Sequence, residues 1–221
     1  MLHIDQTFNK YETLVEGVDQ AVKKIGEAHS ECLRCAPHCS DCCQAIFDLS
    51  LIESVYINYR FYQSLEKSVQ DRVLERADRA DRQAYRLKRR IHKMLSQGEK
   101  TEEEVLSLLA EERLRCPFLN ESDLCDAYHL RPITCRAYGL TTIIHGAGYS
   151  CGKSGFAEGG AYRSINLDRI NQHLGVLSEE LLIEIGSPED LKDRLVPLSS
   201  ALLTDYDDEY FGLKKDCAAE G

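Results

Sequence analysis

The chain has 221 residues and a formal net charge of −10, from 27 Lys and Arg against 37 Asp and Glu. This length suits a single domain over residues 1–221, and the acidic balance argues against general binding to nucleic acids or anionic membranes. No stretch approaches the roughly 18 apolar residues of a membrane span, and residues 1–5 do not resemble a signal peptide. We therefore expect a cytoplasmic protein, whose ten cysteines stay reduced and indicate metal or redox chemistry.

The N-terminal part of the chain is expected to be helical. Apolar residues at helical spacing predict a helix over residues 5–30. Ser50 and Glu53 have the spacing of a capping box, which predicts that a second helix begins near Leu51.

A long helix should follow over residues 64–96, because its apolar and Ala positions alternate by three and four. A capping box at Thr101 predicts a shorter helix that ends near residue 115. We interpret residues 64–115 as an inserted antiparallel helical hairpin, whose Ala-rich face could accept a protein partner. The basic stretch 72–93 could contact nucleic acid or an acidic partner, but a solvated helix face with i,i+4 ion pairs is the favoured interpretation.

The C-terminal part is predicted to be mostly helical as well. Residues 141–145 are the best strand candidate because of their β-branched content. Short helices are expected over residues 167–174 and 179–185, and Ser at a cap followed by Pro predicts a third from residue 187. Residues 205–221 are expected to form a flexible tail.

The cysteines gather in two segments far apart in the chain. Two thiolates separated by two residues can curl around one metal ion, as in zinc sites, and iron–sulfur clusters use similar turns. Buried structural thiols are the alternative, but five cysteines within twelve residues argue against it. The first segment contains Cys32, Cys35, Cys39, Cys42 and Cys43, and the second contains Cys116, Cys125, Cys135 and Cys151.

The adjacent pair Cys42 and Cys43 bears on the number of metals. Neighbouring side chains point in well-separated directions, so the two are expected to serve different metals unless one is a bystander. Leaving aside Cys32 and Cys217, eight cysteines would complete two four-thiolate sites. These are Cys35, Cys39, Cys42, Cys43, Cys116, Cys125, Cys135 and Cys151.

Other side chains near the cysteines are weaker candidates. Cys32 is a possible extra ligand, and His38 and His145 could bind metal, although a lone His more often lies behind the ligands or faces solvent. Arg131 and Arg136 flank a cysteine and are expected just outside the ligands. There they could offset thiolate charge or grip an anion, but a structural role is favoured.

The order of these residues carries a family resemblance. Cys35 to Cys43, then Cys116-Pro117-Phe118-Leu119, then Cys125 to Arg136 with its Arg131-Pro132 pair, and finally Cys151 resemble the YkgJ-type cysteine-cluster proteins. The first motif has one residue more than the family's Cys-x-x-Cys-x-x-Cys-Cys.

The YkgJ-type proteins are described as zinc- or iron-chelating domains. The resemblance therefore implies a cytoplasmic metal-binding protein that holds zinc or an iron–sulfur cluster such as 4Fe–4S. Flagellin lysine N-methylase looks like a larger, distant relative of this family, so the resemblance faintly implies lysine methylation with S-adenosylmethionine as an alternative.

The sequence thus predicts a mainly α-helical fold. Helices should pack around an irregular cysteine-rich metal-binding core, with the helical hairpin inserted between the two cysteine segments. The predicted function is the binding of metal ions through both segments. The alternatives are a protein-lysine methyltransferase and an electron-transfer or redox-sensing iron–sulfur protein. A redox dithiol is less well supported because no βαβ pattern accompanies the cysteines.

Overall fold

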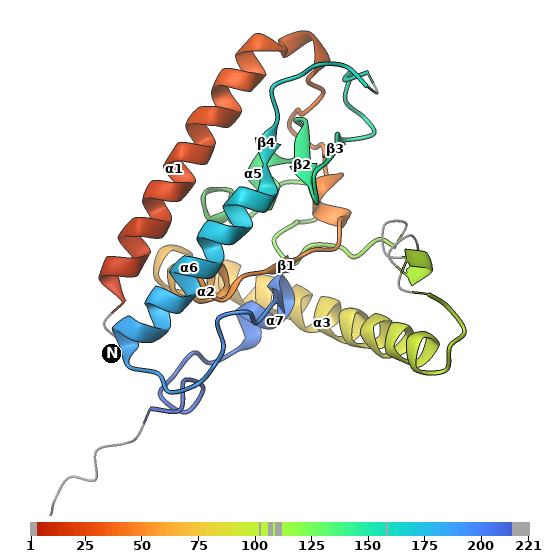
Figure 1. Cartoon of the computed structure of the whole chain (residues 1–221). Helices are drawn as coiled ribbons and strands as arrows, with labels where there is room; N and C mark the ends of the chain where they lie inside the picture. Colours follow the sequence, from red (N-terminus) through yellow and green to blue (C-terminus); the bar gives the residue numbers. More distant parts are fainter. Residues whose placement is uncertain (1–3, 102, 106–107, 109–111, 158, 214–221) are drawn as a thin grey trace, which may run out of the picture.

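The computed structural model describes residues 4–213 except 102, 106–107, 109–111 and 158. The described chain is mainly α-helical, with only short strands, as the sequence predicted (Figure 1). No helix among these residues is long and apolar enough to cross a membrane.

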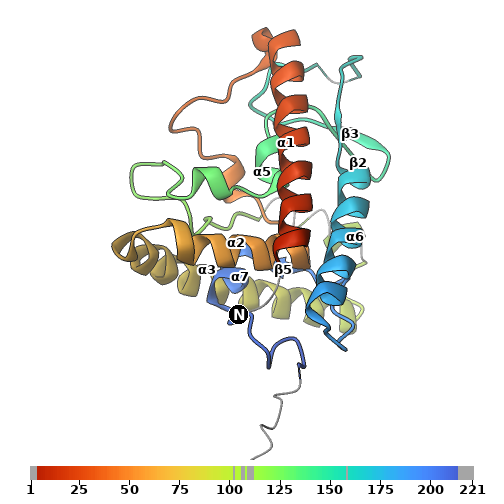
Figure 2. The ribbon, with the colours of Figure 1, turned by 90° about the vertical axis from the view of Figure 1, so that its left-hand side faces the viewer.

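Two long helices, α1 (Asp5–Ala28) and α6 (Leu167–Ile185), pack side by side and stand upright in Figure 2. Their facing sides carry apolar residues at helical spacing, and these close a core together with the start of the next helix. The end of α6 is also tied to the start of α1, because Glu184 accepts a hydrogen bond of 2.9 Å from the backbone N–H of Thr7. The core includes Phe8, Tyr11, Val18, Leu51, Ile52, Val55, Leu174 and Leu181.

Three further helices lie across the lower end of this pair: α2 (Leu51–Ser64), α3 (Lys67–Ser96) and α7 (Leu198–Leu203) (Figure 2). The hydroxyl of Ser50 accepts a hydrogen bond from the N–H of Glu53, so the predicted start of α2 is confirmed.

The Ala-rich seam of α3 is covered by α7, which also packs on α2. The small side chains let the short helix approach closely, and the buried seam positions are Val73, Ala77, Ala80 and Ala84.

The expected hairpin partner of α3 is only partly described. Thr101 forms the predicted capping box, because its N–H donates to the Glu104 carboxylate and its hydroxyl accepts from the N–H of Glu104. Residues 103–105 and 108 are helical and 112–115 are not, while 102, 106–107 and 109–111 lie outside the described residues. An ion pair between Arg90 and Glu112 connects the outer half of α3 with the returning chain. The antiparallel hairpin stays a prediction.

The short strands form two small sheets. Strand β1 (Asp48–Leu49) pairs antiparallel with β5 (Val196–Pro197). In the other sheet, β2 (Thr142–Ile144) lies between β3 (Ala147–Tyr149), which is antiparallel to it, and β4 (Ile165–Asn166), which is parallel. The strand predicted around residues 141–145 is confirmed as β2.

The helices predicted over 167–174 and 179–185 are wrong as separate elements, because α6 is continuous from Leu167 to Ile185. Its buried seam runs through Leu174, Leu177 and Leu181, and this burial outweighs the cost of Gly175, roughly 1 kcal/mol relative to Ala.

The helix predicted to open at residue 187 is also wrong. The Ser187 hydroxyl donates to the carbonyl of Phe211 and accepts from the N–H of Glu189, so it closes a turn. The next helix is α7, which begins eleven residues later at Leu198.

Residues 205–213 pack against the α1–α6 core. Phe211 is fully buried there, and Tyr206, Tyr210 and Leu213 contact the same cluster. The expectation of a tail from residue 205 did not include this packing. Residues 214–221 lie outside the described residues.

Candidate metal centre

The two cysteine segments meet around one cavity of about 400 Å³, which we call the thiol cavity. Eight of the nine cysteines in the described part of the chain line it. They are the eight that the sequence grouped as ligands: Cys35, Cys39, Cys42, Cys43, Cys116, Cys125, Cys135 and Cys151. Seventy-two residues lie between Cys43 and Cys116, so the fold has to bring the segments together.

Backbone hydrogen bonds join the two segments directly beside the cavity. The N–H of Cys116 donates to the carbonyl of Cys43 at 2.8 Å, and the N–H of Leu114 donates to Gln44 at 3.0 Å. The first segment forms a 3-10 turn, η2 (Cys42–Gln44), and then continues into β1. This pairing fixes Cys43 and Cys116 next to each other.

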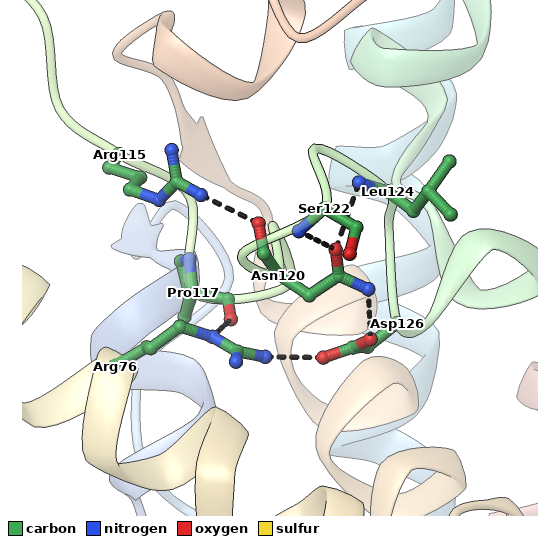
Figure 3. Close-up of polar contacts among 7 residues, drawn as sticks. All are labelled: Arg76, Arg115, Pro117, Asn120, Ser122, Leu124 and Asp126. Carbon is green, nitrogen blue, oxygen red and sulfur yellow. Dashed lines mark hydrogen bonds and ion pairs between the residues drawn. The ribbon is translucent and has the colours of Figure 1, made fainter. Parts of the chain in front are cut away.

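The loop between Cys116 and Cys125 is shaped by side chains from inside and outside it (Figure 3). Asn120 accepts hydrogen bonds from the N–H groups of Ser122 and Leu124 through its Oδ1 atom, at 2.9 and 3.0 Å. Its Nδ2 atom donates to Asp126 at 2.8 Å. The loop therefore turns back sharply, and Leu119 and Cys125 form an antiparallel bridge.

Helix α3 anchors this loop through Arg76. Its Nε atom donates to the carbonyl of Pro117 at 2.7 Å, and its guanidinium pairs with Asp126 at 2.5 Å. Both charged side chains are largely buried, with 10% and 15% of their surface exposed. The pair holds the chain immediately after Cys116 and immediately after Cys125.

Cys135 is carried by the short helix α5 (Ile133–Ala137), which follows the 3-10 turn η3 (Tyr128–Leu130). The backbone N–H of Ile133 donates to the carboxylate of Glu53 on α2 at 3.0 Å. Helix α5 also packs against α1. Cys135 is thus presented to the cavity from the helical core.

A polar group surrounds Cys151 at the other side of the cavity. The carboxylate of Asp41 accepts a hydrogen bond of 2.9 Å from Tyr138 and pairs with Lys153 at 3.2 Å. Burial would raise the pKa of this carboxyl, but the hydrogen bonds from Tyr138 and Lys153 hold it below its usual value. The Cys151 sulfur lies 3.8 Å from Asp41 and accepts a hydrogen bond from the N–H of Lys153 at 3.4 Å.

Cys35 lies close to the backbone of Gly139. This glycine has φ of +96°, and a Cβ atom there would stand 2.4 Å from the Cys35 sulfur. Only glycine satisfies both conditions. Cys35 and Cys39 are exposed, whereas the other six thiols of the cavity are half-buried.

The sulfurs of Cys42 and Cys43 lie 3.9 Å apart. A tetrahedral zinc site with Zn–S bonds of about 2.3 Å has sulfur–sulfur edges of about 3.8 Å. The 3-10 turn η2 thus brings the neighbouring side chains close enough to share an ion, so the sequence argument that they point well apart does not hold here. Among the described residues, no three Cys, His, Asp or Glu side chains stand close enough together to hold a metal ion.

Burial raises the pKa values of the thiols in the deeper part of the cavity. Burial raises the pKa of Cys116 to about 12. Burial also raises the pKa of Cys135, helped by the neighbouring sulfurs of Cys116, Cys42 and Cys125. Arg131 acts in the opposite direction on the pKa values of Cys125 and Cys135.

Cys42, Cys116 and Cys135 also line a second cavity of about 640 Å³ between α3 and the cysteine segments. Its other walls are mainly apolar and include Phe47, Leu87 and Ile91. These three thiols therefore form part of the wall between the two cavities.

The two arginine candidates lie in different places relative to the thiol cavity. Arg131 lines the thiol cavity, with its guanidinium 3.5 Å from the centre of the Tyr128 ring. Arg136 does not line it, and instead pairs with Asp19 of α1 at 2.7 Å and donates to the carbonyls of Arg131 and His129. Its contacts are those of a structural residue.

Cys32 lies apart from the other thiols. It is buried in η1 (Ser30–Cys32), where its sulfur contacts Glu31 at 3.7 Å. His38 lines the cavity but directs Nδ1 to the carbonyl of Ser122 at 2.8 Å. His145 lies in the β2–β3 turn, outside the cavity lining.

The sequence interpretation did not identify Glu53, Arg76 or Asp41 as parts of this centre. Asp41 could have been suspected because it lies between two cysteines. Glu53 and Arg76 act on loops that are 80 and 41 residues away in the chain. No motif spacing could have indicated either contact.

The family model CxxCxxCC, described as "Putative zinc- or iron-chelating domain", matches residues 34–152. The matched region begins just before Cys35 and ends just after Cys151, so it contains every thiol of the cavity. No curated protein and no solved structure matches the chain.

Proposed function

Because the chain belongs to the CxxCxxCC family of zinc- or iron-chelating domains, we propose that it holds zinc or an iron–sulfur cluster through the cysteines of the thiol cavity. The observation that carries this proposal is the gathering of eight thiols from two distant segments around one space. A cavity of about 400 Å³ exceeds the roughly 30 Å³ that one water molecule occupies in the liquid. It has room for more than a single ion.

The groups around the thiols favour the deprotonated thiolate form. Arg131 places a permanent positive charge on the cavity wall, and the N–H of Lys153 donates to the Cys151 sulfur. Such groups stabilise thiolates, which are the metal-binding form of cysteine. Metal binding has to displace protons from the deeper thiols, so the affinity for metal should rise with pH.

We assign the thiols to two groups by their neighbours. Cys42, Cys116, Cys125 and Cys135 influence one another and form the deeper group. Besides burial, Cys39 and Cys151 raise the pKa of Cys35, as Cys42 does to a smaller extent. Cys35, Cys39 and Cys151 form the outer group together with Cys43. Cys43 lies 3.9 Å from Cys42 at the boundary between the groups, and we place it in the outer group because the deeper group already has four thiols. Each group supplies four thiolates, the number that a structural zinc ion or a 4Fe–4S cluster requires. Closing either group around a metal requires the sulfurs to move inward.

The test is metal analysis of the full chain purified without oxygen. The wild type should hold two metal centres per chain, and a brown colour with absorbance in the blue would identify iron. Cys135→Ser and Cys39→Ser should each remove one centre, in the deeper and outer groups respectively. Cys32→Ser is the matched control and should leave the metal content unchanged, because Cys32 lies outside the cavity.

Each alternative outcome has a definite meaning. One centre in the wild type that persists in Cys39→Ser would reject the outer site, and full metal content in both variants would reject the cavity as the binding site. Reversible bleaching of a brown protein by a reductant would favour electron transfer. Saturable S-adenosylmethionine binding, measured by calorimetry, would favour the methyltransferase alternative.

A further inference from the structure

Glu53 is the one carboxylate among the buried side chains of the described chain. It lies in the first turn of α2 with 3% of its surface exposed, inside the α1–α2–α6 core. A carboxyl group in such a place costs free energy unless hydrogen bonds satisfy it. A Gln or an apolar residue would fill the same volume at lower cost, so the retained carboxylate needs an explanation.

The Glu53 carboxyl group interacts with Ser50 at the N-cap of its own helix and also forms hydrogen bonds to two other elements. Oε1 of Glu53 accepts from the backbone N–H of Ile133 at 3.0 Å and from the hydroxyl of Tyr11 at 3.3 Å. Ile133 is the first residue of α5, and Cys135 follows two residues later. The carboxylate therefore joins α1, α2 and the helix that carries a proposed ligand.

Ile133 is buried in the helical core, but the first turn of α5 has no capping group of its own. The helix has only five residues, and the residue that precedes it, Pro132, provides no side-chain cap. The first N–H groups of any helix lack partners within that helix, and a carboxylate at this end is favourable. Glu53 supplies from α2 the acceptor that α5 lacks in its own sequence.

We propose that Glu53 is a positioning residue for the metal centre, which holds α5 so that Cys135 faces the deeper thiols. This inference rests on the proposed function. Groups that orient metal ligands without touching the metal typically change the affinity by 10- to 100-fold when they are removed. The effect of Glu53 should therefore be seen in metal binding, beyond any effect on folding.

The experiment compares the wild type with variants of the full chain. It measures the zinc affinity of each protein and the melting temperature of its metal-free form. Glu53→Met keeps the size but removes the acceptor, and should weaken zinc binding at the deeper site by 10- to 100-fold in competition with a chromophoric chelator. Glu53→Gln keeps one acceptor oxygen and should restore the affinity to within a few-fold of the wild type. If Glu53→Met does not fold, Tyr11→Phe removes one of the two bonds and should give a smaller loss.

Ser178→Ala is the control for general destabilisation. Ser178 is fully buried and its hydroxyl accepts from the N–H of Ile52, next to Glu53, but it does not contact α5. It should lower the melting temperature of the metal-free protein and leave the zinc affinity unchanged. An equal loss of zinc affinity in Ser178→Ala and Glu53→Met would show a merely structural role and overturn the inference.

A second test asks whether the effect of Glu53 is confined to the group that contains Cys135. In Cys135→Ser only the outer group should still bind zinc, and adding Glu53→Met should leave that remaining affinity unchanged. A loss of zinc affinity at the outer group would overturn the inference. The outcomes for the two proposals are distinct: a wild type that binds no metal rejects the proposed function, whereas a wild type and Glu53→Met with the same affinity reject only the role of Glu53.

Discussion

Arg76 shows how a single side chain outside the cysteine segments holds the geometry between two thiols. It binds the backbone after Cys116 and the carboxylate after Cys125, and both members of the ion pair are mostly withdrawn from water. Removing one partner of such a pair leaves an uncompensated buried charge, which typically costs about 3–5 kcal/mol. Removing one partner of an exposed ion pair costs less free energy of unfolding, because water still solvates the remaining charge.

We therefore expect Arg76→Met to reduce the free energy of unfolding by about 3 kcal/mol, measured by urea titration. Arg82→Met is the matched control on the same helix, because its pair with Asp78 is exposed at 60% and 51% of the two side chains. Exposed i,i+4 pairs contribute about 0.3–0.5 kcal/mol. Equal costs for the two variants would contradict the structural role given to Arg76.

At this scale the sequence indicated which thiols gather around one cavity but not the residues that support them. The eight cysteines were identifiable as a group because they cluster in two segments with short, regular spacing. Arg76 and Glu53 carry ordinary side chains at positions where a solvated or helical-core residue is equally expected. Their roles depend on contacts across the fold, which a single sequence does not contain.

At the scale of elements, the packing of α3 against α7 decides where the long helix attaches. Ala77 is fully buried in this contact and Ala80 is 5% exposed. Larger side chains there would push the two helices apart. Inserting extra methyl groups into a well-packed core typically costs about 1–3 kcal/mol.

Ala77→Leu should accordingly lower the free energy of unfolding by about 2 kcal/mol in urea titration. Ala28→Leu, at the exposed end of α1, is the control and should change it by less than about 0.5 kcal/mol. An unchanged free energy of unfolding in Ala77→Leu would mean that α7 does not pack tightly on α3.

Elements with strong local signals were predictable and those fixed by tertiary contacts were not. The capping box before α2 and the periodicity of α1 act within a few residues, so both helices were found. Helix α6 continues past Gly175 because its buried seam faces α1, and α7 is short and has no side-chain cap. Both depend on partners that lie far away in the chain.

At the scale of the whole molecule, the apolar core is divided in a way that separates stability from metal binding. The cluster between α1, α2 and α6 includes no cysteine among its described members. The cluster under α3 and α7 is bordered by Cys116 and Cys125. The proposed metal centre would therefore close the cysteine segments onto a helical frame that has its own core.

Removal of the metal should loosen only part of the molecule. Metal binding contributes folding free energy where the ligands are otherwise held by few contacts, which here applies to the exposed and half-buried residues 34–47, 120–126 and 147–156. Amide hydrogen exchange should become faster in these segments after chelation, while α1, α2 and α6 keep their protection. Helical circular dichroism should change little. Leu51, Ile52 and Ile57 are fully buried in the helical cores, so α2 should hold without the metal. Faster exchange throughout α2 would therefore show that the frame depends on the metal, and unchanged exchange near the cysteines would show that no metal closes them.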